Sequence, residues 1–437
     1  MKCINCQADN KLKERTANRG RCRRCKHQFT FEPTSMTGVK ITDPMFAKAI
    51  ADISVNDTLF FTPKQLFYLL DKRSKPKIDD MFHTVPGYII INIFSSIFVG
   101  MWAVIIVSIF YEWSIAFILV MFAINCLLIK RTFTASRSSN YPYQQRQKFA
   151  KNLQIWGVIV LVFGIGFNLL SSSFTLFLAS SILGITSIYL SSLKSDKKTA
   201  NSQYFTINSN QFQDWMNTWK KINSMTKVLP PPRDTNANIA VSPDVSAYSF
   251  DRLVVCDRPE IAQFLIANNF HFENNCAVLS ITGYPQSIFD ITMQMLRRNP
   301  DLKVYALHDC SPKGIGLVDH LRTSPNWFPD SSAIIIDIGL LPRQIIEVGD
   351  SMFVINSKSA ARDAVQLSSA IRQGLSAEEL EWLELGNYVE LESFSPQKLI
   401  QILNRGIASS RDLDSDDSSL ILLGGVDNSI YVVDSFG

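Results

Sequence analysis

The run RLVVC at residues 252–256 opens a series of four short β-branched segments, which continues with AVLSI at 277–281, KVYAL at 303–307 and AIIIDI at 333–338. The stretches between these segments have the apolar spacing of helices. Strands that are apolar on both faces and alternate with helices are typical of a parallel sheet. We therefore predict an α/β domain over residues 246–437, with a mainly parallel sheet and further helices over 359–373, 377–385 and 396–406.

Polar residues follow three of these predicted strands at their carboxyl ends. Asp257 comes directly after the first strand, Asp309 follows the third, and Asp337 lies near the end of the fourth. Ligands of open parallel sheets bind at this edge of the sheet. The candidate site residues are Asp257, Asp309, Ser311, Gly314 and Asp337.

The order of these motifs resembles the Toprim domain of topoisomerase VI A subunits and Spo11-like proteins, over about residues 250–405. That family has an acid after its first strand, then Asp-x-Asp-Pro-x-Gly, then Gly-Leu-x-Pro. Here Asp257 falls at the first acid, the run 309–314 reads Asp-Cys-Ser-Pro-Lys-Gly, and 339–342 reads Gly-Leu-Leu-Pro. The resemblance implies that Asp257 and Asp309 are catalytic and that Mg²⁺ binds beside them. It also implies that Ser311, Gly314 and Asp337 line the cofactor site.

Two departures from the family pattern leave open whether the domain is an enzyme. Asp257 stands where the family usually has Glu, and Ser311 replaces the second Asp of the pair. A serine hydroxyl removes one negative charge from a Mg²⁺ site. No winged-helix domain with a cleavage tyrosine is recognisable, so a topoisomerase reaction is not expected. A site could be rebuilt only if Asp337, Glu260 or Asp290 reaches into the same crevice.

Four cysteines near the start of the chain form two CxxC pairs, Cys3 with Cys6 and Cys22 with Cys25, separated by 15 residues. Each CxxC turn directs two thiolates to the same point, and two turns complete a tetrahedral sulfur site. This spacing predicts a structural zinc ion in residues 1–34. His27 lies close by, but four thiolates already fill the coordination shell.

The segment around the second cysteine pair is rich in arginine and resembles a small zinc ribbon of the kind found on many bacterial proteins. Such ribbons bind DNA, RNA or protein. The basic residues are Arg15, Arg19, Arg21, Arg23, Arg24 and Lys26. Phosphate binding is one explanation of this charge. A solvated surface, or the negative cytoplasmic face of a membrane, explains it about equally well.

Four long apolar runs in the first half predict transmembrane helices within residues 85–194. Apolar residues make up 46% of the 437 residues and charged residues 19%. The runs are 88–110, 113–129, 155–170 and 174–193, each close to the length that crosses a hydrocarbon core. They contain no deep ionisable residue, which favours a membrane anchor over a transporter.

The charges of the flanking loops predict the orientation of these spans. Lysine and arginine crowd the segment before the first run, the loop 130–151 and the segment after the last run, whereas the two other loops have neither. The positive-inside rule then places both termini in the cytoplasm. We expect a multi-pass protein of the cytoplasmic (inner) membrane, with the lipid bilayer as one partner.

Two polar connectors complete the predicted domain organisation, namely residues 35–84 and 195–245. The second contains an amphipathic helix at 209–223, which either docks onto its own domain or lies on a membrane surface. The first functional hypothesis is a membrane-anchored binding module that recognises nucleic acid, nucleotide or a cytoplasmic protein. The alternative is a membrane-tethered, Mg²⁺-dependent nuclease or phosphotransfer enzyme. The sequence does not indicate the oligomeric state.

Overall fold

The computed structural model divides the chain into two compact units. The first consists of residues 1–76, 202–348 and 352–437, and the second of residues 77–201 together with 349–351. Within them the structure describes residues 1–74, 84–106, 113–137, 143–171, 174–193, 205–233, 252–297, 302–329, 331, 333–348 and 352–409. The second unit is therefore an insertion within the chain of the first.

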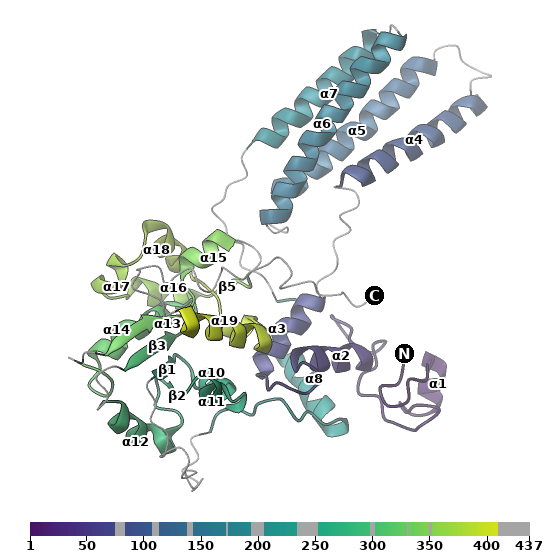
Figure 1. Cartoon of the computed structure of the whole chain (residues 1–437). Helices are drawn as coiled ribbons and strands as arrows, with labels where there is room; N and C mark the ends of the chain where they lie inside the picture. The colour runs from purple at the N-terminus through teal and green to yellow at the C-terminus, as the bar shows by residue number, and fades with distance from the viewer. Residues whose placement is uncertain are drawn as a thin grey trace. The chain divides into compact units, whose positions relative to one another are not determined.

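A four-stranded parallel sheet forms the centre of the α/β domain (Figure 1). Its strands are β1 (Arg252–Cys256), β2 (Cys276–Ser280), β3 (Lys303–Leu307) and β4 (Ile334–Asp337), in the order β2-β1-β3-β4. All three pairings are parallel, so the predicted parallel sheet is confirmed. The chain leaves β1 on one side for β2 and returns past it to β3. This reversal creates a switch point between β1 and β3, where open sheets bind their ligands.

Short helices connect and cover these strands. They are α10 (Pro259–Ala267), α11 (Phe270–Glu273), α12 (Gln286–Leu296), α13 (Pro312–Ile315), α14 (Leu317–Thr323) and α15 (Pro342–Val348). The residues of β1, β2 and β3 are almost all buried, as expected for strands covered on both faces, whereas β4 at the edge of the sheet is only partly buried. The helical stretch between β3 and β4 is interrupted at Gly316, where α13 ends and α14 begins.

The remainder of the α/β domain is a set of short elements after β4. They are β5 (Ile355–Asn356), α16 (Lys358–Val365), α17 (Ser369–Gln373), α18 (Ala377–Glu384), β6 (Asn387–Tyr388), the 3₁₀ helix η3 (Leu391–Ser393) and α19 (Pro396–Ser409). Strands β5 and β6 pair antiparallel. An additional bridge joins Cys310, just after β3, to Val389. This bridge brings η3 to the carboxyl end of β3.

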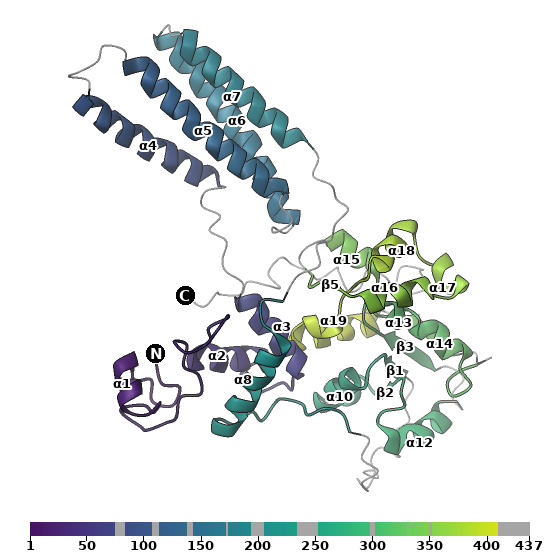
Figure 2. The same cartoon turned by 180° about the vertical axis from the view of Figure 1, so that it is seen from behind.

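A helical module precedes the α/β domain and contains segments from both sides of the insertion. It consists of α2 (Asp43–Ile53), α3 (Pro63–Ser74) and α8 (Ser209–Ile222), which lie together in both views (Figures 1 and 2). The apolar face of α8, with Trp215 and Trp219, is buried in one core with Phe31 and Phe46. The amphipathic helix therefore docks onto its own domain.

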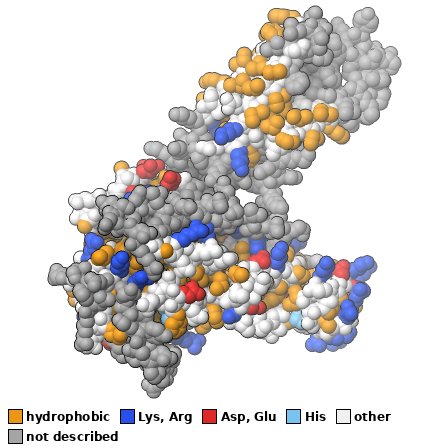
Figure 3. All heavy atoms as spheres, in the orientation of Figure 1, with side chains coloured by type: hydrophobic (Ala, Val, Ile, Leu, Met, Phe, Trp, Pro, Cys, Tyr) orange, Lys and Arg blue, Asp and Glu red, His pale blue; other side chains and the backbone are white. Residues whose placement is uncertain are grey.

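The second unit contains four helices, α4 (Val85–Ile106), α5 (Trp113–Arg137), α6 (Tyr143–Ser171) and α7 (Phe174–Ser192). Tyr88 of α4 stacks on Trp156 of α6 with ring centroids 4.4 Å apart. Polar groups also pair between helices, since Asn125 donates to Asn92 at 2.9 Å. Large apolar side chains are exposed on the described part of these helices, and Figure 3 shows them gathered there.

The prediction of membrane spans is wrong for the helices that the structure describes. In the described part of the chain, none combines the length and the apolar character that crossing a bilayer requires. This contradicts the four transmembrane helices at 85–194, the multi-pass inner-membrane location and the cytoplasmic placement of the termini. A run of apolar letters does not distinguish side chains that face lipid from those that face other helices. Here Leu153 and Trp156 are buried in a core formed between the helices.

Candidate functional site

Two similar turns position the four cysteines of the ribbon, by which we mean residues 1–29. In the first turn the Cys3 N–H donates to the Ala8 carbonyl at 3.0 Å, and in the second the Cys22 N–H donates to the His27 carbonyl at 2.8 Å. Both turns need a left-handed residue, with φ of 60° at Gln7 and 61° at Lys26. The repeated geometry directs all four sulfur atoms to one point.

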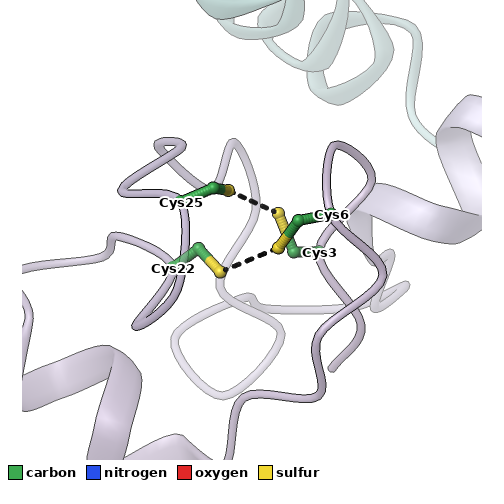
Figure 4. Close-up of side chains that lie close together, drawn as sticks. All are labelled: Cys3, Cys6, Cys22 and Cys25. Carbon is green, nitrogen blue, oxygen red and sulfur yellow. Dashed lines mark hydrogen bonds between the residues drawn. The ribbon is translucent and has the colours of Figure 1, made fainter.

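The sulfur atoms of Cys3, Cys6, Cys22 and Cys25 face one another in the interior of the ribbon (Figure 4). The Sγ atoms of Cys3 and Cys25 are 3.6 Å apart, as are those of Cys6 and Cys22. All four lie within 4.8 Å of one another. Four thiolates at this spacing form the donor set of a tetrahedral sulfur site. The cluster could therefore hold a metal ion such as zinc.

Neutral hydrogen-bond donors surround the sulfur of Cys22. The fully buried Asn10 donates its side-chain N–H to this sulfur at 3.5 Å, and the Arg24 backbone N–H donates at 3.4 Å. Burial acts to raise the pKa of Cys22, but the backbone N–H groups of Cys25 and Arg24, together with the Asn10 amide, outweigh it and lower the pKa to about 6. Burial dominates at Cys3 and raises its pKa to about 12. Such contacts orient metal-ligating thiolates and tune their charge.

The second cluster lies at the switch point of the sheet. Asp257 follows β1 and Asp309 follows β3, and the Asp309 backbone N–H donates to the Asp257 carboxylate at 2.9 Å. The parallel register brings these two predicted residues together, since Cys256 is paired with Leu307. We call Asp257, Arg258, Asp309, Glu390 and Glu392 the carboxylate cluster.

Arg258 occupies the centre of the carboxylate cluster. Its guanidinium lies 3.0 Å from an oxygen of Asp309 and 2.7 Å from one of Glu392. Lys64 of α3 supplies a second cation, with its Nζ 2.7 Å from Glu390. Neither cation is among the site residues predicted from the sequence, and neither are the two additional acids. The acids belong to the run Glu390-Leu391-Glu392, whose two close carboxylates are a signal that the sequence does contain.

Two other predicted residues shape the loop around Asp309. Ser311 caps α13, because its hydroxyl accepts the Gly314 N–H at 3.0 Å. A Cβ atom on Gly314 would lie 2.3 Å from the Asp309 carbonyl oxygen, so only glycine fits there. Both residues thus fix the position of the Asp309 backbone.

Asp337 is held by His308, the residue before Asp309. The His308 Nε2 atom lies 3.0 Å from the Asp337 carboxylate, and Nδ1 lies 2.8 Å from the Asp309 carbonyl oxygen. Both neighbours are acceptors, so the ring satisfies both only as a doubly protonated imidazolium. Burial opposes this charge, but Asp337 and the carbonyl raise the pKa of His308 to about 9.

Burial sets the charge balance of the carboxylate cluster. It is the main cause that raises the pKa of Asp257, and it raises the pKa of Asp309 to about 7 with help from the neighbouring Asp257. The Lys64 ammonium and the Tyr68 hydroxyl outweigh burial at Glu390 and lower its pKa. Glu390, next to the helical module, therefore holds its charge more readily than Asp257 and Asp309.

The remaining acids proposed for a rebuilt metal site are Asp290 and Glu260. Asp290, on α12, lines a cavity of about 430 Å³ with Phe289 and Arg297. Among the described residues, no hydrogen bond or ion pair joins Asp290 or Glu260 to the carboxylate cluster. In the part of the chain that the structure describes, the four cysteines are the one group of three or more His, Cys, Asp or Glu side chains that could hold a metal ion.

In comparisons with known proteins, no family model and no curated protein matches the chain.

Proposed function

We propose that the chain is a nucleic-acid-binding protein, in which a zinc ion holds the ribbon and the ribbon supplies the contact surface. The observation that carries this proposal is the charge on the ribbon, where many exposed cations surround the cysteine cluster. They are Lys2, Lys11, Lys13, Arg19, Arg21, Arg23, Arg24 and Lys26. Figure 3 shows lysine and arginine side chains gathered over the ribbon, where α1 (Leu12–Ala17) lies.

The acids of the ribbon leave most of this charge uncompensated. Asp9 pairs with the N-terminal ammonium at 3.0 Å, and Glu14 pairs with Arg23 at 2.6 Å. A zinc ion bound by four thiolates adds a net charge of about −2. The cations still outnumber these negative charges, and exposed arginine and lysine are the side chains that bind phosphate.

The resemblance of the α/β domain to Toprim domains supports nucleic acid over other polyanions. We propose that this domain is a degenerate relative of Toprim domains that has a structural role and does not cleave nucleic acid. The hydrogen bonds and ion pairs of the site residues speak against the nuclease alternative. Asp309, which would hold a metal, is bonded to Arg258 and to the Leu391 N–H at 2.6 Å. Ser311 is engaged as a helix cap.

The test is fluorescence anisotropy with labelled duplex DNA, single-stranded DNA and RNA, using the full chain over a series of salt concentrations. The variant Lys13→Gln/Arg21→Gln/Arg24→Gln removes three cations of the ribbon. We expect weaker binding and a slope of log Kd against log salt that is less steep by roughly 2 to 3. The matched control, Arg322→Gln/Arg343→Gln/Lys358→Gln, removes three exposed cations of the α/β domain.

Equal loss of binding in both triple variants would contradict the ribbon as the contact surface. Absence of salt-dependent binding to all three nucleic acids would contradict the function itself. The same samples, incubated with Mg²⁺ or Mn²⁺, report on the alternative. Cleavage that disappears in Asp309→Asn would restore the nuclease interpretation.

A further inference from the structure

The Arg258 guanidinium forms the connection between two acids that are distant in sequence. One terminal nitrogen approaches both oxygens of Asp309, at 3.0 and 3.2 Å, and the other donates to Glu392 at 2.7 Å. The Glu392 side chain is 2% exposed and that of Asp309 is 7% exposed. Two buried carboxylates this close together are unfavourable unless a cation lies between them.

The oxygens of this group are already engaged by the protein. Besides Arg258, Asp309 accepts the Leu391 N–H at 2.6 Å, and Glu392 accepts the Thr62 hydroxyl at 2.8 Å. Asp257 is the exception, since one of its buried carboxylate oxygens has no hydrogen-bond partner. Magnesium demands near-octahedral oxygen ligands and is usually held by one or two carboxylates with waters and phosphates. One open oxygen beside a guanidinium does not meet this demand.

We infer that Arg258 is a built-in replacement for a divalent cation: its guanidinium holds Asp309 and Glu392 together and excludes metal from the switch point. The residues present thus disagree with the Mg²⁺ that the Toprim resemblance implies. The planar guanidinium suits this role because it donates several parallel N–H bonds to carboxylates and keeps its charge when buried.

A second cation repeats the same arrangement at the edge of the cluster. Lys64 pairs with Glu390 at 2.7 Å and lies 3.8 Å from Glu392, and the Tyr68 hydroxyl donates to Glu390 at 2.7 Å. Lys64 and Tyr68 belong to α3, whereas the acids belong to the turn around η3. Arg258 and the half-exposed Lys64 therefore compensate the acids, and Lys64 also joins the helical module to the α/β domain.

The test compares thermal unfolding and metal binding of the full chain with those of Arg258→Gln. The wild type is expected to show no change in Tm with Mg²⁺ or Mn²⁺ and no metal binding that depends on Asp309. Arg258→Gln leaves the two buried acids uncompensated, so its Tm should fall by on the order of 10 °C. Added Mn²⁺, or guanidinium at a concentration too low to denature, should restore part of that loss.

Two further variants test the inference even if Arg258→Gln folds poorly. Arg258→Gln/Asp309→Asn/Glu392→Gln removes the charge conflict, so it should regain Tm and respond to neither cation. Arg322→Gln, on the exposed face of α14, is the matched control and should behave as the wild type does. Asp309-dependent metal binding in the wild type would overturn the inference, as would an unchanged Tm in Arg258→Gln. These measurements do not involve nucleic acid, so their failure is separate from that of the proposed function.

Discussion

The ribbon and the carboxylate cluster both gather ionisable side chains, but they neutralise them in opposite ways. The donors around the cysteine sulfurs are neutral, namely backbone N–H groups and the Asn10 amide. The donors around the carboxylates are the cations Arg258 and Lys64. Four thiolates without a neighbouring cation could hold an external metal ion, whereas the carboxylates have cations within the chain. The difference separates a candidate metal site from a network of ion pairs within the chain.

Removing the metal from the ribbon should have the largest effect. Binding of structural zinc contributes on the order of 10 kcal/mol to the folding of small cysteine domains, because the site does not exist in the unfolded chain. A strong chelator, or Cys22→Ser, should therefore unfold residues 1–29. Hydrogen exchange of the peptides that contain the Cys3 and Cys22 amides should rise to the unfolded rate.

The control for this experiment is Cys126→Ser, which removes an exposed cysteine outside the ribbon. It should keep both the metal content and the exchange protection of the ribbon. A preparation grown with zinc that contains no stoichiometric metal, but protects the same amides, would contradict the comparison. The four cysteines would then be held as the carboxylates are, by the protein alone.

The second largest effect should come from raising the pH, which lowers the free energy of unfolding through His308, beside the carboxylate cluster. The pKa of His308 is about 9 in the folded chain, against an ordinary value of 6.5. Its protonated form thus stabilises the fold fully below pH 6.5, and this contribution disappears as the pH rises through about 9. The difference corresponds to about 3 kcal/mol. Urea unfolding over this pH range measures it.

The variant His308→Gln separates this contribution from those of neighbouring groups. The groups that face His308 are Asp337, Asp257 and the Asp309 carbonyl. The pKa of Asp309 is raised from 3.8 to about 7, so the contribution of its protonated form is lost mainly between these pH values, and above pH 7 the variant should keep almost no slope. A wild type whose stability is flat from pH 6.5 to 9 would show that the imidazole is neutral.

Sequence reasoning was sufficient where the chemistry is local or strictly periodic. The two CxxC pairs identified the cysteine cluster, because each pair is fixed by its own turn. The alternation of strands and helices identified the parallel sheet, and with it the meeting of Asp257 and Asp309. The role of Arg258 could not be predicted from the sequence. Arg258 looked like an ordinary loop residue, because its partner Glu392 lies 134 positions away.

The apolar runs of the first half show a different limit. Their length and lack of charge predicted membrane spans, yet the described helices do not qualify as such. Composition counts apolar side chains, but it does not record which of them face other helices. The same limit applied to the helix at 209–222, whose burial against α2 and α3 required the partner surface that its own sequence does not contain.

The smallest expected effect concerns the exposed charge of the ribbon. Glu14→Gln frees Arg23 from its ion pair, and because exposed pairs contribute little, thermal stability should hardly change. The freed guanidinium adds one phosphate contact, so the slope of log Kd against log salt should steepen by roughly 1. The control Glu384→Gln frees Arg372 of α17 in the same way and should leave the slope unchanged. Equal slopes for the wild type and Glu14→Gln would place Arg23 outside the contact surface, which would then be confined to the other exposed cations of the ribbon.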